Sequence, residues 1–112
     1  MTKIAIETNC EIIKKGLQNI LKDYEVLDFY EETSEKIDLL IFEDKSLEKR
    51  KEDKIRIVDE RKLPLNIDYS IISIRATEDE VLEAVDKTLR GYNYIEESLN
   101  KIKKLEIKNM KN

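Results

Sequence analysis

A run of almost continuous apolar residues, Ile37–Phe42, constrains the fold of this chain more than any other feature. A strand with apolar residues on both faces is typical of a parallel sheet that is covered on both sides. Turn-forming and charged residues bound further short apolar segments, which indicates additional strands. The predicted strands are Lys3–Glu7, Tyr24–Tyr30, Ile37–Phe42, Ile55–Val58 and Ser70–Ile74.

Two segments have helical rather than strand periodicity. In Thr77–Arg90, Thr77 and Glu80 have the spacing of a capping box, and Gly91 can adopt the left-handed conformation that ends a helix. Apolar residues at helical spacing also occupy one side of Glu11–Lys22. A strand followed by a helix and then by further strands indicates an α/β protein.

The segment Ala76–Ile95 resembles the last helix of bacterial response-regulator receiver domains of the NarL/FixJ type. That helix typically reads Ala-Ser-Pro-Glu-Glu-Leu-Leu-Glu-Ala-Ile and closes with Arg-Gly, two variable residues and Tyr-Leu. Near the N-terminus, Lys14–Leu17 is similar to the Arg-Glu-Gly-Leu of the family. The resemblance implies a CheY/flavodoxin-like fold, with a five-stranded parallel sheet of order 2-1-3-4-5, over residues 1–95. Residues 96–112 would form a basic tail, predicted as a helix.

Three of the five receiver helices are expected to be missing or very short. The connections Glu31–Lys36 and Arg61–Tyr69 are too short for a helical crossover, and Lys45–Lys54 is almost wholly charged. In receivers the first and fifth helices cover one sheet face and the other three cover the opposite face. That opposite face is therefore expected to be thinly protected, and either a second copy of the chain or the tail is expected to cover it.

The receiver phosphorylation site is degenerate in this sequence. Thr8 and Asn9 occupy the positions of the magnesium-binding acids, and Glu43 occupies that of the phosphorylated aspartate. Asp59 replaces the conserved threonine or serine, and Ile74 replaces the lysine. Because phosphoryl transfer needs a positioned carboxylate, a metal and a cation, the resemblance implies no catalytic residue, no metal and no cofactor.

Local structure offers simpler roles for several of these residues. Thr8 and Glu11 have the spacing of a capping box, which would explain Thr8 without any chemistry. Glu43 and Asp44 are interpreted first as solvated acids at a strand end, with a fixed negative charge at Glu43 as the alternative. Cys10, the only cysteine, is predicted to be a small buried residue.

A metal-dependent enzyme is the main alternative. Open α/β sheets bind ligands at the carboxyl ends of their strands, and several acids follow the predicted strands there. An acid in the first strand with acids after a later one is faintly similar to the Toprim arrangement of nucleases and topoisomerases. The residues that could hold a divalent ion on this hypothesis are Glu7, Glu43, Asp44 and Asp59.

Composition limits the remaining classes. A chain of 112 residues with 40% hydrophobic content is enough for one small domain. Its net charge of -4 argues against a broad nucleic-acid surface, and a single cysteine with no histidine argues against a zinc site. No segment has the length and apolar character of a signal peptide or a membrane span, so we expect a cytoplasmic protein without membrane contact.

The function predicted from these features is that of a non-catalytic, receiver-like regulatory domain. It would bind a protein partner or form a homodimer, independently of phosphorylation, in bacterial two-component-type signalling or transcription regulation. No helix-turn-helix follows the receiver-like part, so direct DNA binding is not expected. The remaining alternative is a small structural protein. The predicted contact residues are Tyr92, Tyr94, Leu99 and Ile102.

Overall fold

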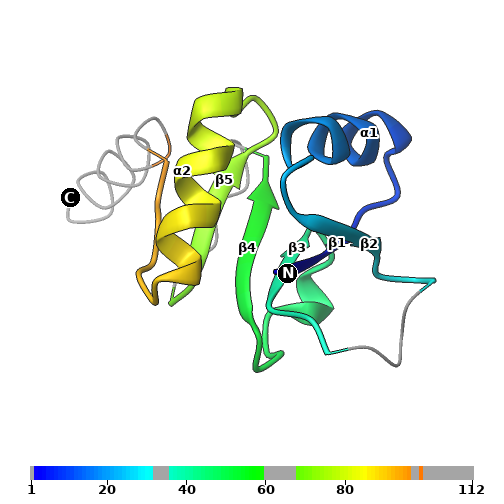
Figure 1. The fold of residues 1–112 in the computed structure, drawn as a ribbon. Helices are drawn as coiled ribbons and strands as arrows, with labels where there is room; N and C mark the ends of the chain where they lie inside the picture. The colour runs from blue at the N-terminus through cyan, green and yellow to red at the C-terminus, as the bar shows by residue number, and fades with distance from the viewer. Residues whose placement is uncertain (1, 32–35, 60–67, 97–98, 100–112) are drawn as a thin grey trace.

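The computed structural model describes residues 2–31, 36–59, 68–96 and 99. Five parallel strands form one sheet in the order β2-β1-β3-β4-β5 (Figure 1). The α/β fold class and the predicted strand order are confirmed. The strands are β1 (Lys3–Glu7), β2 (Glu25–Asp28), β3 (Leu39–Phe42), β4 (Asp53–Val58) and β5 (Ser70–Ser73).

Within the described residues there are two α-helices, α1 (Glu11–Ile20) and α2 (Glu78–Leu89), and one short 3-10 helix, η1 (Lys45–Leu47). The crossover between β3 and β4 therefore holds a single turn, as its charged sequence predicts. The connections at residues 32–35 and 60–67 lie outside the described residues. None of the described helices is long and apolar enough to cross a membrane.

The ends of α2 match the sequence prediction. The Thr77 hydroxyl accepts a hydrogen bond from the Glu80 amide at 3.2 Å, and the Glu80 carboxylate accepts one from the Thr77 amide at 2.9 Å. This capping box satisfies two amides that lack partners within the helix. At the other end, Gly91 has a φ of 91°, a conformation that glycine adopts without steric cost.

The beginning of α1 differs from its prediction. Its N-cap is Cys10, which makes no side-chain capping bond and is exposed rather than buried. The capping box predicted for Thr8 and Glu11 is wrong, because the Thr8 hydroxyl accepts a hydrogen bond from the Cys10 amide at 3.0 Å. Thr8 therefore lies two residues before the cap, in the turn that leads from β1 into the helix.

Both helices lie on the same face of the sheet and contact each other (Figure 1). The strands contribute alternate residues to this face because side chains of a strand alternate between its two sides. The resulting core is an apolar cluster of buried side chains. It contains Ile4, Ile6, Leu39, Ile41, Ile55, Ile57 and Ile72 from the strands and Leu17, Leu21, Val81, Ala84 and Val85 from the helical side.

The intervening strand residues form a second apolar cluster on the opposite face. Leu40 and Phe42 at its centre are fully buried, and Tyr69 packs edge-on against Phe42. Leu99 belongs to this cluster and is fully buried, with Ile95 packed at its margin. Of the two covers predicted for this face, the position of Leu99 supports the tail.

The chain after α2 also covers the outer edge of β5. The Ile71 amide donates to the Tyr94 carbonyl at 2.8 Å, and the Glu96 amide donates to the Ile71 carbonyl at 3.3 Å. The Ser70 hydroxyl accepts a hydrogen bond from the Tyr94 amide at 2.8 Å. Residues 94–96 thus satisfy the backbone groups of an edge that would otherwise be open to other chains.

Candidate functional site

The carboxyl ends of β1 and β3 form the point where the sheet order changes direction. The chain passes from β1 to β2 on one side and later returns to place β3 on the other side of β1. In open α/β sheets, ligands bind in the crevice at such a switch point.

The carboxylate of Glu7, the last residue of β1, lies at this point and is only 2% exposed. One of its oxygens, Oε1, accepts hydrogen bonds from the backbone amides of Glu43 at 3.1 Å and Asp44 at 2.9 Å. The other oxygen, Oε2, accepts a hydrogen bond from the Tyr30 hydroxyl at 2.7 Å. A buried carboxylate needs such donors, and here both oxygens have them.

Tyr30 is bound to the site by this hydrogen bond, although more than half of its surface is exposed to solvent. The bond from its hydroxyl to Glu7 raises the pKa of Tyr30 to about 12, with burial and the negative charges of Glu7 and Asp44 as further causes. A phenol that donates to an anion resists deprotonation because its loss of a proton would place two negative charges together.

Thr8 links the turn after β1 to the end of β3. Its hydroxyl donates to Oε1 of Glu43, and the same hydroxyl oxygen accepts the Cys10 amide. Asp44 follows and caps η1 by accepting the Ser46 amide at 3.0 Å, which lowers the pKa of the Asp44 carboxyl. Glu43 and Asp44 are thus held by specific hydrogen bonds rather than only solvated.

The other residues predicted to occupy receiver positions are Asn9, Asp59 and Ile74. Asn9 is exposed, Asp59 is half-buried after β4, and Ile74 is 54% exposed after β5. The Ile74 amide donates to the Val58 carbonyl at 3.2 Å, so the end of β5 stays next to the end of β4. Where a receiver has a lysine, this edge presents an apolar side chain.

The acids proposed as metal ligands in the alternative hypothesis lie partly together. Glu7 and Glu43 share the hydrogen-bonded cluster, whereas Asp44 caps η1. Among the residues that the structure describes, no three acids, histidines or cysteines are placed to hold a metal ion. A divalent ion at Glu7 would compete for a carboxylate whose Oε1 already accepts two backbone amides and whose Oε2 accepts the Tyr30 hydroxyl.

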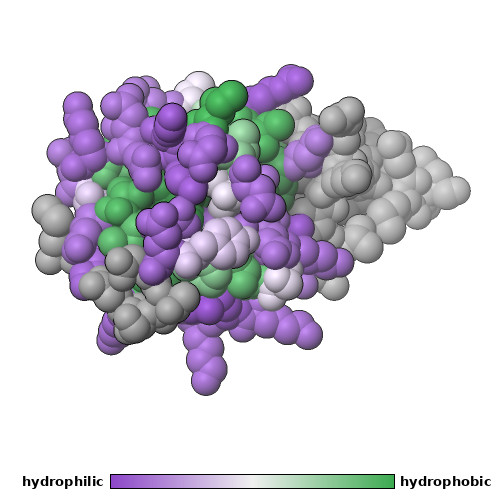
Figure 2. Space-filling view, turned by 90° about the vertical axis from the view of Figure 1, so that its right-hand side faces the viewer, coloured by the Kyte–Doolittle hydropathy of each residue, from purple (hydrophilic) through white to green (hydrophobic). Residues whose placement is uncertain are grey.

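The predicted contact residues have different environments. Tyr92 is 66% exposed, Tyr94 is partly buried against the helix-covered core, and Leu99 is fully buried. Ile102 lies outside the described residues. Figure 2 shows the side that carries α1 and β2, where hydrophilic residues cover most of the surface and hydrophobic ones reach it in separate patches. Among the predicted contact residues that the structure describes, only Tyr92 is a large exposed apolar side chain.

Sequence reasoning missed Tyr30, which it placed at the end of a strand without a role. The predicted sheet order contained a usable signal, because β2 lies next to β1 and both strands end at the same edge. A tyrosine just after β2 is therefore brought close to an acid at the end of β1.

Comparisons of the chain with models of protein families, with curated proteins and with solved structures find no match. The receiver resemblance therefore rests on the sequence motifs. The parallel sheet order agrees with it but is shared by other α/β proteins, so the fold alone assigns no activity.

Proposed function

We propose that this chain is a non-catalytic, receiver-like regulatory domain that acts by binding protein, independently of phosphorylation. The observation that carries the proposal is the carboxylate of Glu7, which occupies the switch point of the sheet and is held there by Tyr30 and two backbone amides. The chain supplies its own anion where a ligand would otherwise enter.

This arrangement ties the loop after β3 to the end of β1. A phosphoryl group regulates a protein by adding negative charge and acceptor oxygens that attract nearby donors. Here the amides of Glu43 and Asp44 already donate to the side chain of Glu7. Because no modification is needed to satisfy these donors, the domain presents a constant surface and its regulation lies with its partner.

The test compares thermal melts of the protein with and without magnesium, manganese and beryllofluoride, a mimic of a phosphoryl group. We expect the same melting temperature in all four conditions, because the acidic edge has no open site. Light scattering after size-exclusion chromatography, run in parallel, gives the oligomeric state.

A rise in melting temperature with metal, lost in Glu7→Gln or Glu43→Gln, would reject the proposal and support the metal-dependent enzyme. The matched control is Glu83→Gln, which changes a half-exposed acid on α2, far along the chain from this edge. A rise that survives in all three variants would indicate ion binding elsewhere on an acidic protein, and the proposal would stand.

A further inference from the structure

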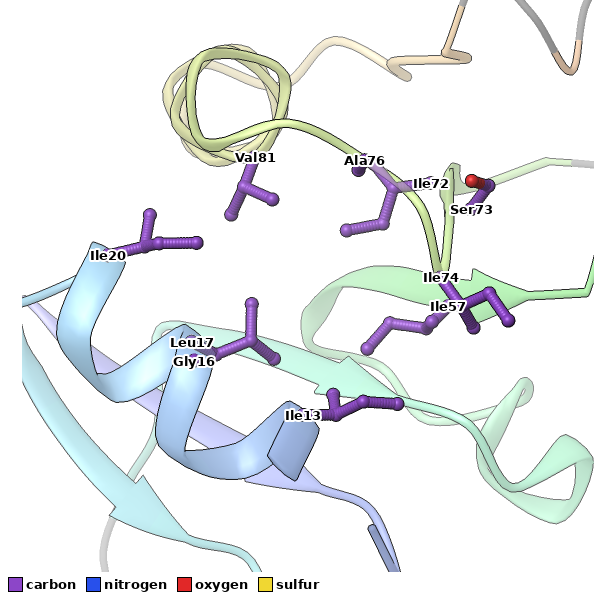
Figure 3. A pocket seen from close by; sticks show the side chains of 10 residues that line it. All are labelled: Ile13, Gly16, Leu17, Ile20, Ile57, Ile72, Ser73, Ile74, Ala76 and Val81. Carbon is purple, nitrogen blue, oxygen red and sulfur yellow. The ribbon is translucent and has the colours of Figure 1, made fainter. Parts of the chain in front are cut away.

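A second surface feature lies at the same end of the sheet but on the helix-covered face. It is an apolar groove with a volume of about 120 Å³ that is open to solvent. In Figure 3, side chains of α1 point across it toward those of β4, of α2 and of the turn after β5. The groove is lined by Ile13, Leu17 and Ile20 on one side and by Ile57, Ile74 and Val81 on the other.

One large exposed apolar side chain lines this groove, and another lies on the neighbouring surface of α1. Ile74 lines it and is 54% exposed, and Ile12 on α1 is 83% exposed. Ile12 lies one helical turn before Gly16, which also lines the groove, so the two residues are neighbours on the surface of α1. The chain therefore places an apolar projection beside an apolar recess.

Gly16 lies in the interior of α1, where glycine is unfavourable compared with alanine. A Cβ atom added at Gly16 would meet no other atom within 4 Å, and the residue does not have a positive φ. Neither the packing nor the backbone of a single chain therefore requires glycine here. A close approach by another molecule would explain it, because glycine lets two helices come nearer to each other.

We infer that this surface, defined by Ile12, Gly16, Ile74 and the groove between them, binds a second copy of the same chain. In a two-fold dimer the same surface meets itself, so it must carry both a projection and its recess. Ile12 and the groove meet that requirement. The two α1 helices would cross at Gly16, with Ile12 of each copy seated in the groove of the other.

The charges around the groove also favour a second copy. Arg75, which follows the groove residue Ile74, is an exposed base, and Glu78 and Asp79 are exposed acids in the first turn of α2. A surface with charges of both signs can pair bases with acids when it meets itself, which an interface of one sign cannot do. The inference rests on the proposed binding function and names its partner.

The test measures self-association by sedimentation velocity over a wide range of protein concentration. The wild-type chain is expected to dimerise. Ile12→Ser should raise the dissociation constant roughly a hundredfold, since the change occurs twice in a two-fold interface and one such apolar contact is worth about a factor of ten. The matched control is Tyr92→Ser, another large exposed side chain, which should leave the constant unchanged.

Gly16→Leu gives an independent test because it fills the crossing point while leaving Ile12 in place. A Cβ atom at Gly16 meets no other atom within 4 Å, and circular dichroism checks that the leucine variant folds. Dimer formation should be lost. If Gly16→Leu folds and dimerises as tightly as the wild type, the inferred crossing is wrong.

A wild-type chain that stays monomeric at every concentration would overturn the inference, as would a dimer broken by Tyr92→Ser but not by Ile12→Ser. Either result leaves the proposed function standing, since that is judged by the melts with metal and beryllofluoride. Conversely, a metal-dependent melt lost in Glu7→Gln rejects the proposed function even if the dimer forms through Ile12.

Discussion

The carboxylate of Glu7 has three hydrogen-bond donors and almost no contact with water. Its oxygens are required to satisfy the amides of Glu43 and Asp44, so the side chain ties β1 to the loop after β3. Removing such a residue lowers stability mainly because its hydrogen-bond donors are left without an acceptor.

Glu7→Leu should therefore destabilise the protein by about 2–4 kcal/mol, because two amides and a phenol lose their acceptor in a partly buried site. Glu7→Gln should cost about 1 kcal/mol or less, since its amide oxygen can accept both amides and its nitrogen can donate to Tyr30. Denaturant unfolding measures both values. Equal costs for the two variants would show that charge, rather than the acceptor oxygen, holds this site together.

Tyr30 allows a test of the same site by pH. The folded-state pKa of Tyr30 is about 12, above its ordinary value of 10.0, with the hydrogen bond to Glu7 as the main cause. Because the pKa is raised, the contribution of this bond to stability is fully present below pH 10.0 and is lost as the pH rises toward about 12.

Ultraviolet titration of tyrosinate should show a late ionisation step from Tyr30. Tyr30→Phe should remove that late step, and Glu7→Gln should move it toward the ordinary value. If the ultraviolet titration curves of Tyr30→Phe and the wild type coincide at high pH, the hydrogen bond between Tyr30 and Glu7 does not form in solution.

At the level of elements, the two helices begin in different ways. α2 has a complete capping box, whereas α1 begins at Cys10 without a side-chain cap. Thr77→Ala should destabilise the protein by about 1 kcal/mol, because the Glu80 amide loses its acceptor. Thr77→Ser keeps the hydroxyl and serves as the control in denaturant unfolding. A loss in Thr77→Ser as large as that in Thr77→Ala would locate the effect in the methyl group.

Gly16→Ala should stabilise α1, because alanine loses less conformational entropy and meets no neighbour there. The expected gain is about 0.5–1 kcal/mol. It is best measured in an Ile12→Ser background, where self-association cannot mask it. A destabilised Gly16→Ala variant in that background would mean that the chain itself requires glycine at this position.

The elements could largely be predicted because their signals are local. Apolar runs located all five strands to within a few residues, and Thr77 with Glu80 located the start of α2. The start of α1 was mispredicted because Thr8 has a competing partner, Glu43, which is distant in sequence. The same holds for Glu7 and Tyr30, whose roles depend on which strands become neighbours.

At the scale of the whole molecule, Leu99 connects the tail to the sheet. It is fully buried in the cluster on the second face, together with Phe42, Tyr69 and Ile71. Leu99→Ala should destabilise the domain by about 2–5 kcal/mol, the usual cost of removing a buried leucine side chain. Tyr92→Ala, at an exposed position, should change stability by no more than about 0.5 kcal/mol.

Denaturant unfolding at low protein concentration measures both variants. A Leu99→Ala protein as stable as the wild type would mean that the tail does not cover the sheet in solution. The second face would then be free for a partner.

The strand order has one more consequence, which concerns the synthesis of the chain. β1 is made first, β2 is added on one side of it, and β3, β4 and β5 are then added one after another on the other side. Each later strand therefore finds a neighbour that has already left the ribosome, and residues 94–96, made after β5, cover its outer edge. The sheet is therefore extended outward from β1, and no later strand has to insert between two strands that are already paired.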